Sequence, residues 1–481
     1  MTTRFAVLVL LATLVPGCGR GRVPQPPIPP RLSDGQELLV GLRADADVRR
    51  DLGVYANDGL QQVVQQLCAR LAAASGRAAL PWRATILDVA AANAFALPGG
   101  QIYLTRGLLP YLTSDAELAA VIGHEVAHVA TGLAARQFAA ATTGGGDPLI
   151  IGLFSPIVRR LRPPAAGSIS PTVLFGRFRP DEELVADTLA SGYLARSGFD
   201  PNAVPAFLAS LAEQQLQSDK RGVPTWLETH VSSADLIEQL RAATRTLDTP
   251  PPAGWTVNRD GYQQRVHGMV FGDNPRDGLV RGREFIQAER RFALTIPARW
   301  EVTNSRMQMA VEHPDEDAAL VVRVLPRARR ADLAAVARTT MEGAGFRTAG
   351  GEETTINGAP AFVGTWDGER DAASPVRVRA AFVRLGSVVH LLAGIASADR
   401  FTFVEASLQA SISSFRAIDG AEADRVRMNV IDLYSVQPGD TWDRIARHFG
   451  GIVMPATLAQ MNHGLPDPVP PGTRVKVVTT R

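Results

Sequence analysis

Apolar and polar positions follow two different periods along the chain, and the change of period divides it into regions. Between residues 54 and 247 apolar residues recur every three or four positions, which predicts helices at 54–74, 114–128, 181–196, 205–219 and 232–247. A strand at 85–89 and a hairpin at 93–109, with its turn at Pro98-Gly99-Gly100, interrupt this helical series. We therefore predict a mostly helical first domain that contains a small β-hairpin or sheet.

From residue 254 the pattern changes to runs typical of strands. It predicts strands at 292–297, 318–325, 361–366, 376–383 and 387–393, with helices at 331–343 and 400–413. A compact βααβ module is expected from Tyr434 onward. The predicted fold class is α+β, in which a helical domain is followed by an α+β sandwich with an antiparallel sheet and by the small module. We place these three domains at 35–250, 251–418 and 419–481.

The N-terminus has the pattern of a secretory signal. Arg4 precedes an apolar run from Phe5 to Val15, which is too short to span a bilayer comfortably. The run leads to Cys18 through a segment that resembles a bacterial lipobox. We expect residues 1–17 to be a signal peptide and Cys18 to be lipidated, with a plain cleaved signal or a short anchor as alternatives. Gly19 favours an outer-membrane lipoprotein that faces the periplasm.

Length and composition restrict the class of protein further. A chain of 481 residues is too long for one core, and 46% hydrophobic with 20% charged residues is typical of folded, soluble material. The 50 basic and 48 acidic residues nearly cancel, and no basic stripe with interleaved aromatic residues is present, so we predict no nucleic-acid partner. Residues 18–34 form a proline-rich spacer. Cys68 is predicted to be an inert, buried thiol because Cys18 is the only other cysteine.

The stretch 114–128 carries the chemistry. Ser114 and Glu117 have the spacing of a capping box, which predicts a helix start at this point. His124 and His128 then lie one turn apart on one face, the geometry in which two imidazoles bind one metal, and Glu125 is placed to act as a base toward water. The alternative is a helix with two half-buried histidines. With only 8 histidines in the chain, a chance match is an event of order one in a hundred.

A zinc ion, one per chain, needs a third protein ligand. The best candidate is Glu183, which opens a second predicted helix and shares a face with Asp187 at i and i+4. Glu183 would complete a His2Glu site with an open fourth position, and Asp187 could bond the outer nitrogen of a liganding histidine. The alternative is that both carboxylates belong to a solvated helix N-terminus, where acidic residues are favourable.

Four ordered motifs resemble the HtpX/BepA-like family of zinc metallopeptidases. They are Asn93 to Gly100, Ile102 to Leu109, the G-H-E-x-x-H segment at 123–128, and the E-x-x-A-D segment at 183–187. The resemblance implies a mostly helical gluzincin fold, zinc bound by His124, His128 and Glu183, and Glu125 as general base.

In this family the hairpin lies beside the cleft. An edge at Phe95-Ala96-Leu97 or from Gln101 to Tyr103 could therefore align an extended peptide by strand addition. The alternative is that these strands only close the core. The resemblance also suggests His230 as a fourth ligand at rest or an oxyanion donor, although Val231 replaces the usual proline. The segment from Thr142 to Pro180 could be a lid or a membrane-facing loop, or a buried helical turn.

The C-terminal regions suggest recruitment. The domain at 251–418 has no assigned role and weakly resembles a PsbP or Mog1-type sandwich, whereas the tail from Tyr434 resembles a LysM module. LysM domains bind N-acetylglucosamine polymers such as peptidoglycan; a small packing module is the alternative. The remaining histidines have no ligand-like spacing and are assigned to surface or core; they are His267, His313, His390, His448 and His463.

The leading hypothesis is a lipid-anchored zinc endopeptidase that cleaves proteins in the bacterial periplasm, with misfolded envelope proteins as candidate substrates. The alternative is a non-proteolytic scaffold or chaperone-like binder, anchored to membrane and peptidoglycan, whose site is closed by His230 or by the 142–180 segment. Glu125 favours the enzyme, because a scaffold has no need of a general base.

Overall fold

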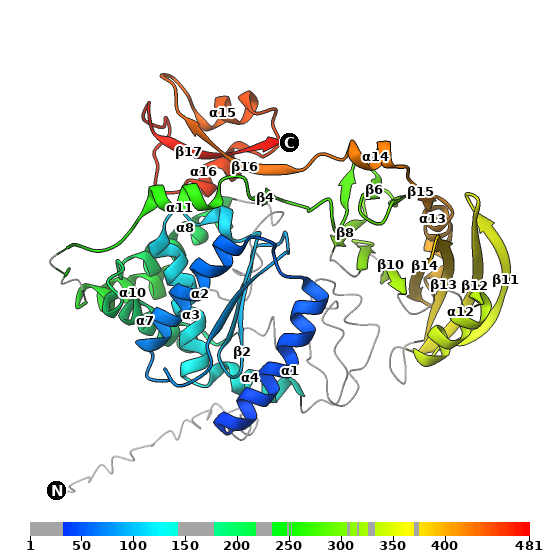
Figure 1. Cartoon of the computed structure of the whole chain (residues 1–481), viewed down its shortest axis with the longest axis horizontal. Coiled ribbons are helices and arrows are strands. Elements are labelled where there is room, and N and C mark those ends of the chain that lie inside the picture. Colours follow the sequence, from blue (N-terminus) through cyan, green and yellow to red (C-terminus); the bar gives the residue numbers. More distant parts are fainter. Residues whose placement is uncertain are drawn as a thin grey trace, which may run out of the picture.

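The computed structural model describes residues 32–142, 178–217, 233–247, 250–251, 253–304, 308–314, 317–325, 332–369 and 375–481. Cys18, His230 and most of the predicted 142–180 segment lie outside these ranges. Within them, none of the helices combines the length and the apolar character that crossing a membrane requires. The predicted α+β class is confirmed, with a helical region, a β-rich region and a small terminal module (Figure 1).

The helical region is arranged around one buried helix. Its helices are α1 (Asp34–Leu52), α2 (Asp58–Ala73), α3 (Asp115–Ala130), α4 (Leu133–Thr142), α7 (Pro180–Arg196), α8 (Ala203–Gln217) and α10 (Ala234–Arg245), with a short 3-10 turn η1 (Leu109–Tyr111) before α3. Every residue of α3 from Asp115 to Val129 is buried, and α2, α4, α7 and α8 all contact it. The five helices predicted from the periodicity are therefore confirmed, and α3 lies at their centre.

A three-stranded sheet lies between α1 and α3. Its order is β1 (Arg83–Leu87), β3 (Gln101–Thr105), β2 (Ala94–Leu97), with β1 parallel and β2 antiparallel to β3. The predicted turn is confirmed, because Gly99 and Gly100 have φ of 77° and 92°, values that glycine adopts without strain. The predicted edge from Gln101 to Tyr103 is wrong: β3 is the central strand and is hydrogen-bonded on both sides, so only β2 and β1 have an open side.

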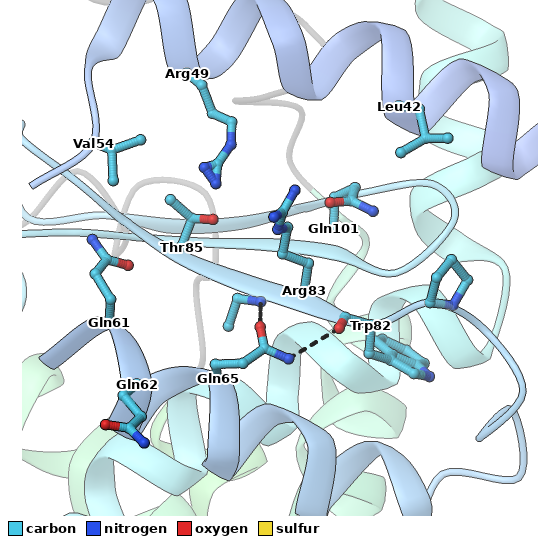
Figure 2. A pocket seen from close by; sticks show the side chains of 12 residues that line it. Leu42, Arg49, Val54, Gln61, Gln62, Gln65, Trp82, Arg83, Thr85 and Gln101 are labelled. Atoms are coloured by element: carbon cyan, nitrogen blue, oxygen red, sulfur yellow. Dashed lines mark hydrogen bonds between the residues drawn. The ribbon is translucent and has the colours of Figure 1, made fainter. Parts of the chain in front are cut away.

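Glutamine side chains close the open side of β1. Gln65 of α2 accepts from the Ala84 amide at 3.0 Å and donates to the Trp82 carbonyl at 3.1 Å, as the dashed lines in Figure 2 show. One turn earlier, Gln61 bonds the amide and the carbonyl of Ile86 at 3.0 and 2.9 Å. Each carboxamide thus presents a donor and an acceptor as a neighbouring strand would. This edge is consequently occupied by its own helix.

The β-rich region contains two antiparallel sheets. One has the order β15 (Arg416–Ala417), β7 (Phe292–Thr295), β6 (Glu284–Gln287), β5 (Leu279–Arg281). The other has the order β11 (Arg347–Ile356), β12 (Ala359–Glu369), β13 (Pro375–Leu385), β14 (Val388–Ser397), β10 (Ala318–Leu325), β9 (Gln308–Glu312), β8 (Glu301–Asn304). Helices α12 (Leu333–Gly343) and α13 (Phe401–Ser413) pack on alternate residues of these strands and so cover opposite faces of the large sheet. The predicted antiparallel sheet is confirmed.

The terminal module has the predicted βααβ order. It consists of β16 (Asn429–Ser435), α15 (Trp442–His448), α16 (Pro455–Met461) and β17 (Arg474–Thr480). A third strand, β4 (Val270–Phe271), pairs with β16, and the preceding α11 (Arg259–Val266) places Tyr262 and Val266 in a core shared by the helical region and the module. Residues 259–271 were predicted to belong to the second domain, which begins at 251. In the structure they pack instead with the helical region and the terminal module.

The β-rich region is therefore an insertion in a continuous body. Arg106, which follows β3, is 1% exposed and donates to the carbonyls of Val270 and Gly272 at 2.8 and 2.9 Å. The chain then leaves this body, forms β5 to β15, passes through α14 (Gly420–Asp424) and returns at β16 beside β4. The helical region and the terminal module thus share one core although about 150 residues separate them in sequence.

Candidate metal centre

The start of α3 is fixed by a polar cap. Ser114 accepts from the Glu117 amide at 3.2 Å, as a helix N-cap does. The second half of the predicted capping box is wrong, because the Glu117 carboxylate does not return to the Ser114 amide. It accepts instead from the amide and the hydroxyl of Thr113, at 2.6 and 2.8 Å. The helix start is therefore tied to the residue that precedes the cap.

Two histidines of α3 converge on one point. The Nε2 atoms of His124 and His128 lie 2.8 Å apart, and their rings meet edge to face at 4.4 Å between centroids. Phe178 stacks on His128 with a centroid distance of 4.0 Å, which restricts the rotation of that imidazole. Both histidines are almost completely buried. Their Nε2 lone pairs can therefore be directed at a shared ligand.

Close contact between α3 and α7 brings in a carboxylate. A Cβ atom on Gly123 would lie 3.2 Å from Leu194 and 3.6 Å from Ala190, so small residues allow the two helices to approach. At the start of α7, one Glu183 oxygen lies 3.4 Å from His124 Nε2 and the other lies 3.8 Å from His128 Nε2. Glu183 is about 60 positions from the histidines in sequence, but the contact between α3 and α7 brings it next to them in space.

These three residues fit a metal ion. They offer one ligand atom each, all within 4.8 Å of one another, and all three side chains are buried. Both Glu183 oxygens lack a hydrogen-bond partner in the described part of the chain, an arrangement that is costly for a buried carboxylate. Burial raises the pKa of Glu183 to about 8. A divalent cation would give both carboxylate oxygens a binding partner and would favour the ionised form, and two imidazoles with one carboxylate form a donor set that suits zinc.

Asp187 lies behind His124. Its Oδ1 is 2.8 Å from His124 Nδ1, and both groups are buried. Burial alone would lower the pKa of His124, but the bond to Asp187, together with the charges of Glu183 and Glu125, raises it to about 9. When His124 is neutral, the bond to Asp187 keeps its one ring proton on Nδ1, so Nε2 is the nitrogen that can bind a metal on the side of His128. The contact thus selects the tautomer that can bind a metal.

The remaining predicted site residues divide into two groups. Glu125 is 1% exposed and lies between the two histidines in sequence, within electrostatic range of His124 and Glu183. Tyr103 donates to Asp45 of α1 at 2.8 Å and therefore belongs to the core on the other side of the sheet. Gln101, Phe95 and Leu97 are buried as well, whereas Ala96 of β2 is partly exposed; the structure thus leaves Ala96 as the accessible position.

Two residues of the terminal module contact the start of α3, and the sequence did not predict either contact. His463, assigned to surface or core, has its Nε2 3.2 Å from a Glu117 oxygen. Lys476 is completely buried and donates to the Pro110 carbonyl at 2.6 Å. Both belong to the terminal module and lie more than 340 positions away in sequence. Nothing in the local pattern around either residue indicates such a partner.

Comparison with known proteins agrees with this geometry. The profile of Peptidase family M48 matches residues 59–244, and that of the LysM domain matches residues 434–478. The putative beta-barrel assembly-enhancing protease of Vibrio cholerae is 29% identical over 271 residues, 53% of this chain and 54% of that protein. The Escherichia coli K12 beta-barrel assembly-enhancing protease is 31% identical over 207 residues, 41% of this chain and 42% of that protein.

More distant relatives include the mitochondrial metalloendopeptidase OMA1 of Arabidopsis thaliana, 33% identical over 161 residues, 34% of this chain and 31% of that protein. The chain spans about half, or less, of the length of these curated relatives. Among solved structures, Synechocystis PsbP aligns with a TM-score of 0.24 and 12% identity over 29% of this chain and 98% of that chain, and yeast Mog1p with 0.23 and 15% over 30% and 98%. Scores this low do not establish the predicted PsbP or Mog1 likeness.

The family profile covers α2 to α10, including both histidines, Glu125, Glu183 and Asp187, and the LysM profile covers the βααβ module. Residues 59–244 thus match Peptidase family M48, and residues 434–478 match the LysM domain.

Proposed function

We propose that this chain is a zinc-dependent endopeptidase that cleaves proteins, with His124, His128 and Glu183 as the metal ligands. The observation that carries the proposal is the buried cluster in which two imidazole nitrogens and a carboxylate without hydrogen bonds face one another. A buried carboxylate without hydrogen bonds costs folding free energy, and a metal ion bound among the three side chains would offset that cost. Zinc bound by these residues would supply Lewis acidity and would lower the pKa of a water molecule in the site to about 7.

The protein groups have separate tasks in this proposal. Glu125 takes a proton from the attacking water and delivers it to the leaving amine, a role supported by its burial within electrostatic range of His124 and Glu183. Asp187 holds His124 in the tautomer with a free Nε2. His230 remains a candidate for a fourth ligand at rest or for an oxyanion donor.

The substrate backbone is proposed to add to the sheet at β2. The Thr105 amide bonds the Asn93 carbonyl, so odd-numbered residues of β2 face β3 and the polar backbone groups of Ala94 and Ala96 point the other way. The Ala94 amide already bonds the Asn93 side chain, which leaves Ala96 as the residue with both groups directed outward. Two observations favour this edge: α3 contacts β2, and the opposite edge at β1 is occupied by Gln61 and Gln65.

The proposed cellular setting rests on the signal-like pattern before Cys18 and on the LysM match. We propose a lipoprotein anchored through Cys18 to the outer membrane and facing the periplasm, with the LysM domain bound to peptidoglycan. Its substrates would be misfolded envelope proteins, in keeping with relatives named beta-barrel assembly-enhancing proteases. The domain partition 1–17, 18–34, 35–250, 251–418 and 419–481 remains a proposal.

The test uses purified full-length protein and casein or a misfolded outer-membrane protein as substrate. Glu125→Gln should retain zinc and lose cleavage, because the amide cannot accept a proton. His124→Ala should lose zinc, as measured by metal analysis. Asp181→Asn, at an exposed position of α7, is the matched control and should behave as wild type. Full turnover by Glu125→Gln would exclude the assigned mechanism, and zinc-loaded wild type without any cleavage would favour the scaffold.

A further inference from the structure

The LysM domain contacts the peptidase domain through a buried lysine. Lys476 of β17 has no exposed surface, and its Nζ donates to the carbonyls of Pro110 and Leu112 while lying 5.8 Å from the centre of the Tyr262 ring. Pro110 belongs to η1, and Leu112 is the residue next to Thr113. A buried amino group requires such hydrogen bonds, because without them its burial would be strongly unfavourable. The lysine is therefore held against the turn that leads into α3.

A second contact reaches α3 itself. The Nε2 of His463 lies 3.2 Å from Oε2 of Glu117, the same carboxylate that bonds the Thr113 amide and hydroxyl. The two side chains are 15% and 6% exposed. His463 follows α16, so one face of the LysM domain supplies both contacts. The domain thus bonds the segment 110–117 at two points.

Glu117 is aligned with the metal site along α3. It precedes His124 by seven residues, so the two side chains project within about 20° of each other and their Cα atoms are about 10 Å apart along the axis. Because α3 is buried along its whole length, it behaves as one packed rod between these positions. A displacement at Glu117 would accordingly be expected to shift His124 and His128.

We propose that His463 and Lys476 are positioning residues for the peptidase site: the LysM domain sets the placement of the metal-binding helix through Glu117 and the 110–113 turn. This inference rests on the proposed function, since it concerns the same metal site. In this proposal the LysM domain helps to build the peptidase site. If the domain served only for attachment, changing its contacts with the peptidase domain would leave the metal site unchanged. The β4 strand and the shared core hold the two units in contact.

The test compares His463→Ala and Lys476→Met with conservative partners. His463→Gln keeps a donor for Glu117, and Lys476→Arg keeps a cation. Met454→Ala, at a 71% exposed position of the same domain, is the matched control. Two quantities are measured on full-length protein: zinc affinity by competition with a fluorescent chelator, and kcat and KM for a quenched-fluorescent peptide.

His463→Ala and Lys476→Met should weaken zinc binding and lower kcat, each by roughly 2- to 30-fold, with KM unchanged because the β2 edge is not touched. His463→Gln should restore most of both values. Folded variants with wild-type zinc affinity and kcat would overturn the proposal, as would loss of melting temperature alone. If even wild type cleaves nothing, the proposed function fails, but the zinc competition still decides this inference.

Discussion

Replacing Asp187 tests how far the metal site depends on a residue that would not touch the metal. In Asp187→Ala the His124 Nδ1 loses an acceptor at 2.8 Å in a buried setting, so the ring is free to adopt the other tautomer or to rotate. Outer partners of this kind change metal affinity by about 10- to 100-fold, which corresponds to about 1.4 to 2.8 kcal/mol. We expect Asp187→Ala near the upper value. Asp187→Asn, which keeps an acceptor without charge, should lie near the lower one.

The assay is zinc competition with a fluorescent chelator, performed on metal-free protein at pH 7.5. Asp181→Asn serves as control, because Asp181 is also an aspartate of α7 but is 68% exposed and forms an ion pair with the exposed Arg179. Its zinc affinity should stay within about twofold of wild type, as expected for a surface substitution. Cleavage rates are measured in parallel at saturating zinc.

An unchanged zinc affinity in folded Asp187→Ala would refute the reasoning, because it would show that the Asp187 contact does not determine which His124 nitrogen is available. If the alanine variant fails to fold, Asp187→Asn decides the matter. A loss of cleavage with wild-type zinc affinity would also count against it, since the carboxylate would then act on the reaction and not on the ligand.

Two further predictions concern stability. Gln61→Ala removes the two bonds to Ile86 and leaves the buried Ile86 amide without a partner, so it should lower the free energy of unfolding in urea by about 2 to 4 kcal/mol. The control Gln62→Ala, at an exposed neighbouring position, should lower it by less than about 0.5 kcal/mol. Equal losses in the two variants would contradict the role assigned to Gln61. Burial lowers the pKa of His390 to about 4, so the folded chain binds fewer protons than the unfolded chain between pH 6.5 and 4. Stability of the β-rich domain should therefore fall by about 3 kcal/mol as the pH drops through this window, and His390→Phe should abolish that dependence, as followed by hydrogen exchange of β14.

The sequence was sufficient where the determinants are local. The Ser114 cap, the apolar period of α3 and the Pro98-Gly99-Gly100 turn each depend on neighbouring residues, so the helix and the hairpin could be placed. The members of the metal cluster could also be predicted, because residues at i and i+4 share a helix face. The family resemblance then supported Glu183 as the third ligand. Local signals could not decide which hairpin strand lies at the edge. That depends on β1, which joins β3 from the other side.

Contacts across long sequence separations explain the other differences. Glu117 fitted a capping box by spacing, but its carboxylate is drawn to Thr113 and to His463 of a domain that follows hundreds of residues later. The role of Lys476 likewise requires the position of Pro110. Strand β4 is only two residues long and pairs with β16 across the inserted domain, so neither periodicity nor turn chemistry could indicate it.

The pairing of β4 with β16 also makes the β-rich domain a removable cassette. Phe271 lies opposite Asn429 in an antiparallel register, which is the arrangement of two strands in a hairpin. A connection of roughly two to five residues can join such neighbours. A chain that runs from Asn274, whose bond to Asp88 is retained, directly into β16 would therefore keep the candidate metal site, the strand edge at β2 and the LysM module in one shorter protein. The contribution of the β-rich domain to substrate choice could then be measured by comparing the substrates that the full-length and the shortened proteins cleave.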